Sequence, residues 1–143
     1  MALGEIVNTK SGPVQGVDHG ARAAESGERR IAVFRGIPYA EAPVGPRRFK
    51  PPVPRTPWTE TLVAEHASPL APQNPSPLES MLGAGQPPIG EDCLSLNIWT
   101  PVADGSARPV LFWIHGGAFV TGTGSTPWYD GTAFAAHHDV VVV

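Results

Sequence analysis

The sequence predicts an α/β protein in which short antiparallel strands lead into a mostly parallel central sheet. Apolar and polar residues alternate over short stretches before residue 35 and again after residue 93. An unbroken apolar run then occupies residues 110–114, and a glycine-rich loop, a short helical pattern and a second apolar run follow it. The order strand, loop, helix, strand is typical of a βαβ unit.

Four short strands are expected before this unit. They are predicted over residues 5–10, 13–17, 31–34 and 94–100. The turn Ser11-Gly12 separates the first two, as in a β-hairpin. In the fourth, Leu94, Leu96 and Ile98 alternate with polar residues, which is the pattern of a half-buried strand.

Proline concentrates in residues 38–88, which hold 13 of the 17 prolines. Because proline fixes φ and removes a backbone donor, this stretch is unsuited to long helices and central strands. It is either disordered or lies along a larger body that supplies its contacts. Apolar residues such as Phe49, Trp58 and Leu62 are threaded through it and favour the second option. We therefore expect a proline-rich wrapping segment.

The second half of the chain contains the expected βαβ unit. Residues 110–114 predict a strand covered on both faces, because the run has no polar position. Asp130 is a candidate cap for a short helix over residues 131–137. Residues 140–143 predict the start of another buried strand. Since the sequence stops within that strand, we expect residues 1–143 to be the N-terminal portion of a single, truncated domain.

Composition argues against several classes of function. The formal net charge is −3, from 10 basic and 13 acidic residues, so neither a nucleic acid nor an anionic membrane is expected as a partner. We expect no signal peptide, and no apolar run is long enough for a membrane span. Cys93 is the one cysteine, which excludes an internal disulfide and fits a reducing, cytoplasmic location. The histidines show no metal-ligand spacing, so no metal and no cofactor are expected.

The chemically informative motif is His115-Gly116-Gly117-Ala118-Phe119, directly after the first apolar run. Glycines let the backbone turn sharply and approach a ligand closely, because they lack Cβ. Backbone N–H groups can stabilise the oxyanion of acyl transfer, and a strand leading into such a turn is typical of the loop that provides them. The alternative is an ordinary glycine-rich turn between a strand and a helix.

Several further segments form a recognisable series. They are Ser-Gly-Pro-Val-Gln-Gly at 11–16, Phe-Arg-Gly-Ile-Pro-Tyr-Ala-Glu-Ala-Pro-Val-Gly at 34–45, Glu-Asp-Cys-Leu-Ser-Leu-Asn-Ile-Trp at 91–99, and Tyr-Asp-Gly at 129–131. Together with residues 110–119, they resemble the type-B carboxylesterase/lipase family, and its para-nitrobenzyl-esterase-like branch in particular. The resemblance covers nearly the whole chain in family order. It implies an α/β-hydrolase fold and a serine esterase that acts on small-molecule carboxylic esters.

The resemblance also implies roles for individual residues. Gly117 and Ala118 would offer two backbone N–H groups to the oxyanion, and Gly116 would shape the turn. Arg48 and Glu91 match positions that form a buried ion pair in the family. This pair would tie the wrapping segment to the strand that follows it.

Some features depart from the family pattern. Residues 78–89 contain no aromatic side chain to hold a quaternary ammonium, which argues against choline esters. Cys93 matches a cysteine that is disulfide-bonded in secreted relatives, but it has no partner here. No G-x-S-x-G motif is present, and Ser125 lacks its spacing. Because the triad order in this fold is serine, acid, histidine, we expect all three after Val143, and His115 is then structural.

Three hypotheses remain open. The chain is the N-terminal segment of a serine carboxylic-ester hydrolase that contributes the oxyanion-hole loop and is inactive alone, or a binding protein of the same fold, or a non-catalytic gene remnant. The reading frame after the codon for Val143 separates them. A frame that continues into G-x-S-x-G favours the first, one that continues without it favours the second, and an immediate stop favours the third.

Overall fold

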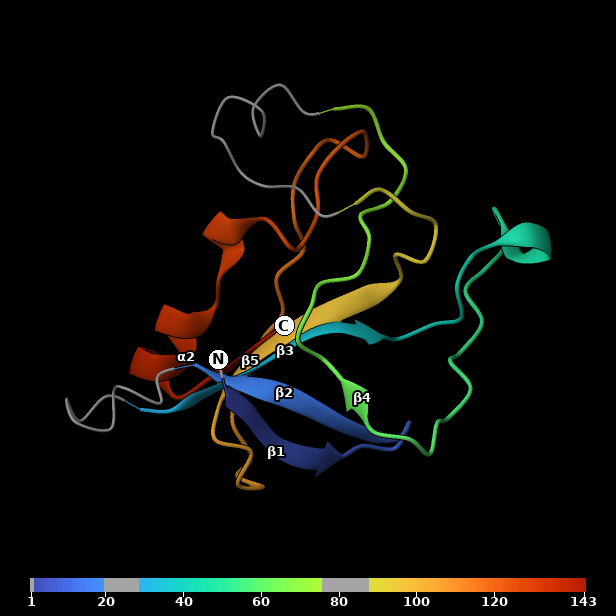
Figure 1. Ribbon diagram of the computed structural model, residues 1–143. Helices are drawn as coiled ribbons and strands as arrows, with labels where there is room; N and C mark the ends of the chain where they lie inside the picture. The colour runs from blue at the N-terminus through green and yellow to red at the C-terminus, as the bar shows by residue number, and fades with distance from the viewer. Residues whose placement is uncertain (1, 20–28, 76–87) are drawn as a thin grey trace.

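A computed structural model describes residues 2–19, 29–75 and 88–143 (Figure 1). Its described strands form one mixed sheet in the order β1-β2-β3-β5-β7-β6, with β4 paired to β2. The strands are β1 (Ala2–Asn8), β2 (Pro13–His19), β3 (Ile31–Pro38), β4 (Leu62–Val63), β5 (Ser95–Pro101), β6 (Val110–Leu111) and β7 (Val141–Val142). The helical elements are the short 3₁₀ turns η2 (Gly45–Arg47) and η3 (Pro127–Tyr129), and helix α2 (Thr132–His138).

The first half of the sheet is antiparallel, as the alternation predicts. β1 pairs with β2, β2 with β3, and β3 with β5, all in antiparallel register. The predicted hairpin turn is present, because Gly12 N–H donates to the Thr9 carbonyl at 3.3 Å and Thr9 N–H donates to the Gly12 carbonyl at 3.1 Å. A register shift in β3 between Phe34 and Ile37 marks a β-bulge opposite β5.

The second half contains the predicted βαβ unit. β6 and β7 are parallel, with Val110 opposite Val141, and the chain between them passes through the glycine-rich loop, η3 and α2. β7 also pairs antiparallel with β5, where Trp99 lies opposite Val142, and this pairing joins the two halves of the sheet. The predicted α/β class is therefore confirmed. Among the described strand pairs, β6–β7 and β2–β4 are parallel and the other four are antiparallel, so the described sheet is mostly antiparallel and not mostly parallel as predicted.

The prediction of a buried strand over residues 110–114 is wrong in its length and in its burial. β6 ends at Leu111, and Phe112, Trp113 and Ile114 are 65%, 54% and 77% exposed. The physical reason is the position of β6 at the edge of the described sheet, where it pairs with β7 alone. Among the described residues, no second strand pairs with β6, so its outer edge and the residues that follow it are left exposed.

Helix α2 begins one residue later than the cap prediction requires. Its N-cap residue is Gly131, and Asp130 precedes it. The Asp130 carboxylate nevertheless accepts the Thr132 N–H at 2.8 Å, which satisfies one of the free donors of the first turn. At the other end, Asp139 adopts a left-handed conformation (φ 53°) that ends the helix.

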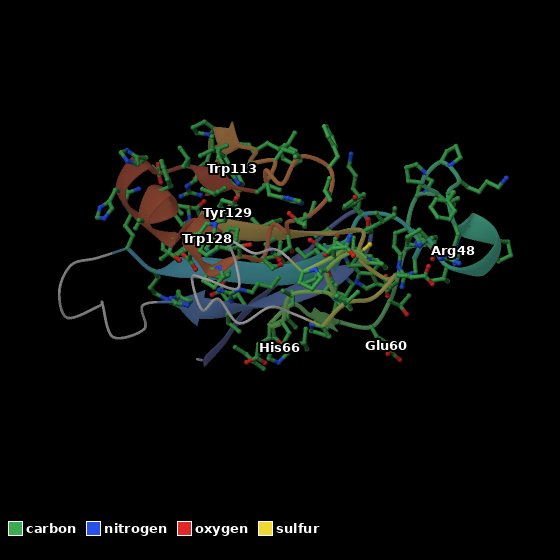
Figure 2. All side chains as sticks on the ribbon, turned by 90° about the horizontal axis from the view of Figure 1, so that it is seen from above. Arg48, Glu60, His66, Trp113, Trp128 and Tyr129 are labelled. Carbon is green, nitrogen blue, oxygen red and sulfur yellow. The ribbon has the colours of Figure 1, made fainter. Side chains whose placement is uncertain are left out.

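Side chains of β3 alternate between two apolar faces of the sheet. Ile31 and Val33 join a cluster on one face, and Ala32 and Phe34 pack in a cluster on the other. The first cluster contains Ala135 of α2, so the helix covers that face. The second contains Val14, Ala64 and Trp58, so the wrapping segment contributes to the cover of the opposite face. In Figure 2 the helix and β4 lie on opposite sides of the strands.

Backbone hydrogen bonds attach the described part of the wrapping segment to β2 and β3. Trp58 N–H donates to the Ser11 carbonyl at 2.7 Å, and the Trp58 indole donates to the Pro13 carbonyl at 3.0 Å. Ala64 N–H donates to the Gln15 carbonyl at 2.7 Å. Proline removes many donors from this segment, and some of those that remain, at Trp58 and Ala64, bind the hairpin turn and β2.

Gly12→Ala is expected to loosen the wrapping segment. Gly12 has φ 146°, and a Cβ there would overlap the carbonyl oxygen and indole ring of Trp58. Trp58 would have to shift, weakening its hydrogen bonds to Ser11 and Pro13 by roughly 1–2 kcal/mol in total. Limited trypsin digestion measures the effect, because cleavage within residues 47–55 should become about 5- to 30-fold faster.

Gly105→Ala is the matched control for this digestion. Gly105 is also left-handed (φ 76°), but a Cβ there would meet no other atom within 4 Å. If both variants are cleaved at the same rate, the contact between Gly12 and Trp58 does not hold the segment in place.

Candidate functional site

The loop that follows β6 presents backbone donors without acceptors. Within the described part of the chain, the N–H groups of Gly116, Gly117 and Ala118 donate no hydrogen bond. The turn is closed instead by the Gly117 carbonyl, which accepts the N–H groups of Val120 and Thr121, each at 3.0 Å. Unpaired N–H groups on adjacent residues can bind an oxygen atom of a ligand.

Three successive residues of this turn have a left-handed backbone. Their φ values are 124° at Gly117, 54° at Ala118 and 60° at Phe119. A Cβ on Gly117 would collide with the Thr121 carbonyl, so glycine is required there. For Ala118 and Phe119 the conformation costs about 1–2 kcal/mol each, and strain of this kind concentrates at ligand-binding and catalytic sites.

Two amide side chains that the sequence analysis did not select hold the chain after this turn. The Gln73 amide oxygen accepts the Gly122 N–H at 2.6 Å, and its nitrogen donates to the Gly122 carbonyl at 3.0 Å. The Asn97 amide nitrogen donates to the Gly124 carbonyl at 3.3 Å and to Ser125 Oγ at 3.2 Å. Both contacts join residues far apart in the chain, so no local pattern reveals them.

A cavity of about 520 Å³ lies beside the loop. Its lining includes Tyr39, Cys93, Asn97, Trp113, His115 and Gly122. His115 and Gly122 stand on either side of the turn, whereas Gly116, Gly117 and Ala118 do not themselves line the cavity. The cavity thus reaches the residues on both sides of the turn.

Three aromatic side chains gather between the loop and α2. The Trp113 and Tyr129 rings lie 5.6 Å apart, and those of Trp128 and Tyr129 lie 6.2 Å apart with the edge of one ring toward the face of the other. Figure 2 shows all three on the helix side of the sheet. Aromatic pairs of this kind add about 0.5–1.5 kcal/mol each beyond the burial of their surface.

Arg48 and Glu91 are brought into contact, with Arg48 Nε 2.6 Å from Glu91 Oε1. Their side chains are 55% and 40% exposed, so the pair forms as the resemblance implies but is not buried. An exposed ion pair contributes about 0–1 kcal/mol. The contact lies by η2, far from the glycine-rich loop (Figure 2).

The remaining sequence candidates do not assemble into a triad or a metal centre. His115 Nδ1 lies 2.7 Å from the Gly116 carbonyl, and Ser125 Oγ contacts Asn97. Among the described residues, no group of three or more potential ligands is placed to hold a metal ion. No helix in the described ranges has the length and apolarity to cross a membrane.

Comparison with known proteins identifies the family. Residues 4–143 match the Carboxylesterase family. Phenmedipham hydrolase of Pseudarthrobacter oxydans is 49% identical over 116 residues, covering 80% of this chain and 24% of the relative. Para-nitrobenzyl esterase of Bacillus subtilis is 42% identical over 139 residues, covering 97% of this chain and 26% of the relative. A solved carboxylesterase of Geobacillus stearothermophilus has a TM-score of 0.76 at 48% identity, covering 96% of this chain and 25% of that chain.

The chain thus belongs to the carboxylesterase family, whose members have the α/β-hydrolase fold. It spans about a quarter of the length of the relatives it matches. The strands and the glycine-rich loop described above are therefore part of a larger architecture in those relatives.

Cys93 is expected to react slowly with alkylating agents in the folded chain. Burial raises the pKa of the Cys93 thiol, and the nearby carboxylates of Asp92 and Glu91 raise it further. Because the thiolate is the nucleophile, a raised pKa lowers the reactive fraction at pH 8. Iodoacetamide should therefore alkylate the folded chain several-fold more slowly than the chain in guanidinium chloride.

Asp92→Asn is the informative variant for this measurement. Removing one negative charge should lower the thiol pKa and speed alkylation of the folded chain, while the unfolded rate changes little. A folded chain that reacts as fast as the unfolded one would contradict a raised pKa of the Cys93 thiol.

Proposed function

We propose that this chain is the N-terminal segment of a serine carboxylic-ester hydrolase and that Gly116, Gly117 and Ala118 form its oxyanion-hole loop. In this proposal, the nucleophilic serine, the acid and the histidine lie beyond Val143, and the chain alone is inactive. The substrates are small-molecule carboxylic esters. The unpaired thiol of Cys93 supports a reducing, cytoplasmic location.

The observation that carries the proposal is the run of unpaired N–H groups from Gly116 to Ala118. An oxyanion hole needs donors that are held in place and not already used. The left-handed backbone at Gly117, Ala118 and Phe119 supports this role, because strained turns persist where the surrounding contacts enforce them. Membership of the carboxylesterase family supplies the reaction class.

A chimera with the para-nitrobenzyl esterase of Bacillus subtilis tests the proposal. Residues 4–143 of this chain replace the matching quarter of that enzyme, which is 42% identical. The chimera should hydrolyse a para-nitrobenzyl ester, and a serine-directed organophosphate should abolish the activity. Gly117→Ala in the chimera should lower kcat about 10²- to 10³-fold with little change in KM, because it displaces donors that act in the transition state.

Gly105→Ala is the control, since it replaces another left-handed glycine in a turn outside the loop. It should leave kcat within about twofold of the parent chimera, as expected for a surface position away from the chemistry. Retention of the parent kcat by a stably folded Gly117→Ala chimera would contradict the oxyanion assignment. The isolated chain should show no turnover, and organophosphate label recovered on one of its serines would contradict the placement of the nucleophile.

A further inference from the structure

Gln73 makes a two-point contact with the end of the glycine-rich loop. Its amide accepts the Gly122 N–H at 2.6 Å and donates to the Gly122 carbonyl at 3.0 Å, while the same nitrogen donates to the Ala71 carbonyl at 3.1 Å. A side-chain amide bound to both groups of one residue fixes its orientation as well as its position. Gln73 thus pairs with both backbone groups of Gly122, as a residue of a neighbouring β-strand does.

Gly122 transmits this contact to the turn that bears the unpaired donors. It has φ 110°, and a Cβ there would lie 2.5 Å from the Gly116 carbonyl oxygen and 2.9 Å from His115 Nδ1. The backbone of Gly122 is therefore packed against the start of the turn. A shift of Gly122 would move Gly116 and His115, and with them the N–H groups that follow.

Among the described residues, the turn is otherwise supported by its own Gly117 carbonyl and, before it, by Trp113, whose N–H donates to the Val143 carbonyl at 2.7 Å. Residues 111–120 are exposed, and β6 ends at Leu111. The second anchor, Asn97, contacts Gly124 and Ser125, further along the chain from the turn. Strained backbone persists only when surrounding contacts enforce it. The Gln73 contact, which acts on Gly116 through Gly122, is therefore expected to contribute most to holding the turn.

Gln73 is itself attached to a fixed point. Leu70 is 4% exposed, its N–H donates to the Pro88 carbonyl at 3.0 Å, and its carbonyl accepts the Gly90 N–H at 2.9 Å. Gln73 follows this buried residue by three positions. The buried, hydrogen-bonded Leu70 therefore fixes the chain just before Gln73, whose amide contacts the loop.

We propose that Gln73 is a positioning residue that holds the oxyanion loop through Gly122, an inference that rests on the function proposed above. It touches no reacting atom. It acts by keeping the free N–H groups of Gly117 and Ala118 in one place, so that they need not reorganise as charge develops in the transition state.

The first test uses the full chain and measures amide hydrogen exchange at Gly122. Gln73→Ala removes both contacts and should speed this exchange at least about tenfold, since the N–H loses its acceptor. Gln15→Ala is the matched control, because Gln15 also donates from its amide to a backbone carbonyl, that of Gly4 at 2.9 Å, but in the β1–β2 hairpin. Equal exchange at Gly122 in the two variants would overturn the proposal.

The second test uses the chimera and separates kcat from KM. Gln73→Ala should lower kcat roughly 10- to 100-fold with KM within about twofold, as displacement of catalytic donors predicts. Gln73→Glu keeps the acceptor for the Gly122 N–H and loses the donors, so its kcat should fall between those of Gln73→Ala and the parent. Gln15→Ala should leave kcat unchanged whatever it does to thermal stability.

The outcomes distinguish this inference from the proposed function. An active parent chimera whose kcat does not respond to Gln73→Ala overturns the role of Gln73 alone. A folded parent chimera without activity overturns the proposed function and, with it, the catalytic role of Gln73, even where the exchange at Gly122 responds.

Discussion

Two apolar faces on a single sheet are the constraint from which the rest of this structure follows. Alternation along β3 and β5 sends apolar side chains to both sides, with Val33 and Trp99 on one and Phe34 and Ile98 on the other. Each face must be covered, because burying such side chains contributes about 1.5–3 kcal/mol apiece. Helix α2 covers one face, and Trp58 and Ala64 of the wrapping segment pack on the other.

The same arrangement explains how an exposed, strained turn is held in place. The wrapping segment packs Ala64 against the sheet and Leu70 against its own later part, and then continues to Gln73, which binds Gly122. β5 contributes Asn97, whose amide contacts the next residues of the loop. Cover of the sheet and support of the loop are therefore provided by the same elements, so a change that frees the wrapping segment should also disturb the loop.

Sequence alone predicts the parts of this structure that depend on local pattern. The hairpin around Gly12, the strand from Ser95 and the helix from Thr132 follow from alternation, turn residues and apolar spacing. The length of β6 is not predictable in this way, because an apolar run does not reveal whether a strand has one neighbour or two. The contact from Gln73 to Gly122 joins two irregular segments that are 49 positions apart, so no periodic pattern in the sequence predicts it.

The central claim is that the backbone N–H groups of Gly117 and Ala118 bind the oxyanion of acyl transfer. A crystal structure of the chimera with an organophosphonate bound to its nucleophilic serine tests this most directly, because the phosphonyl oxygen occupies the position of the oxyanion. If Gly117 and Ala118 bind the oxyanion, both nitrogen atoms should lie within about 2.7–3.1 Å of that oxygen. Nitrogen-to-oxygen distances beyond about 3.6 Å for both residues, with the oxygen bound by other groups, would contradict it.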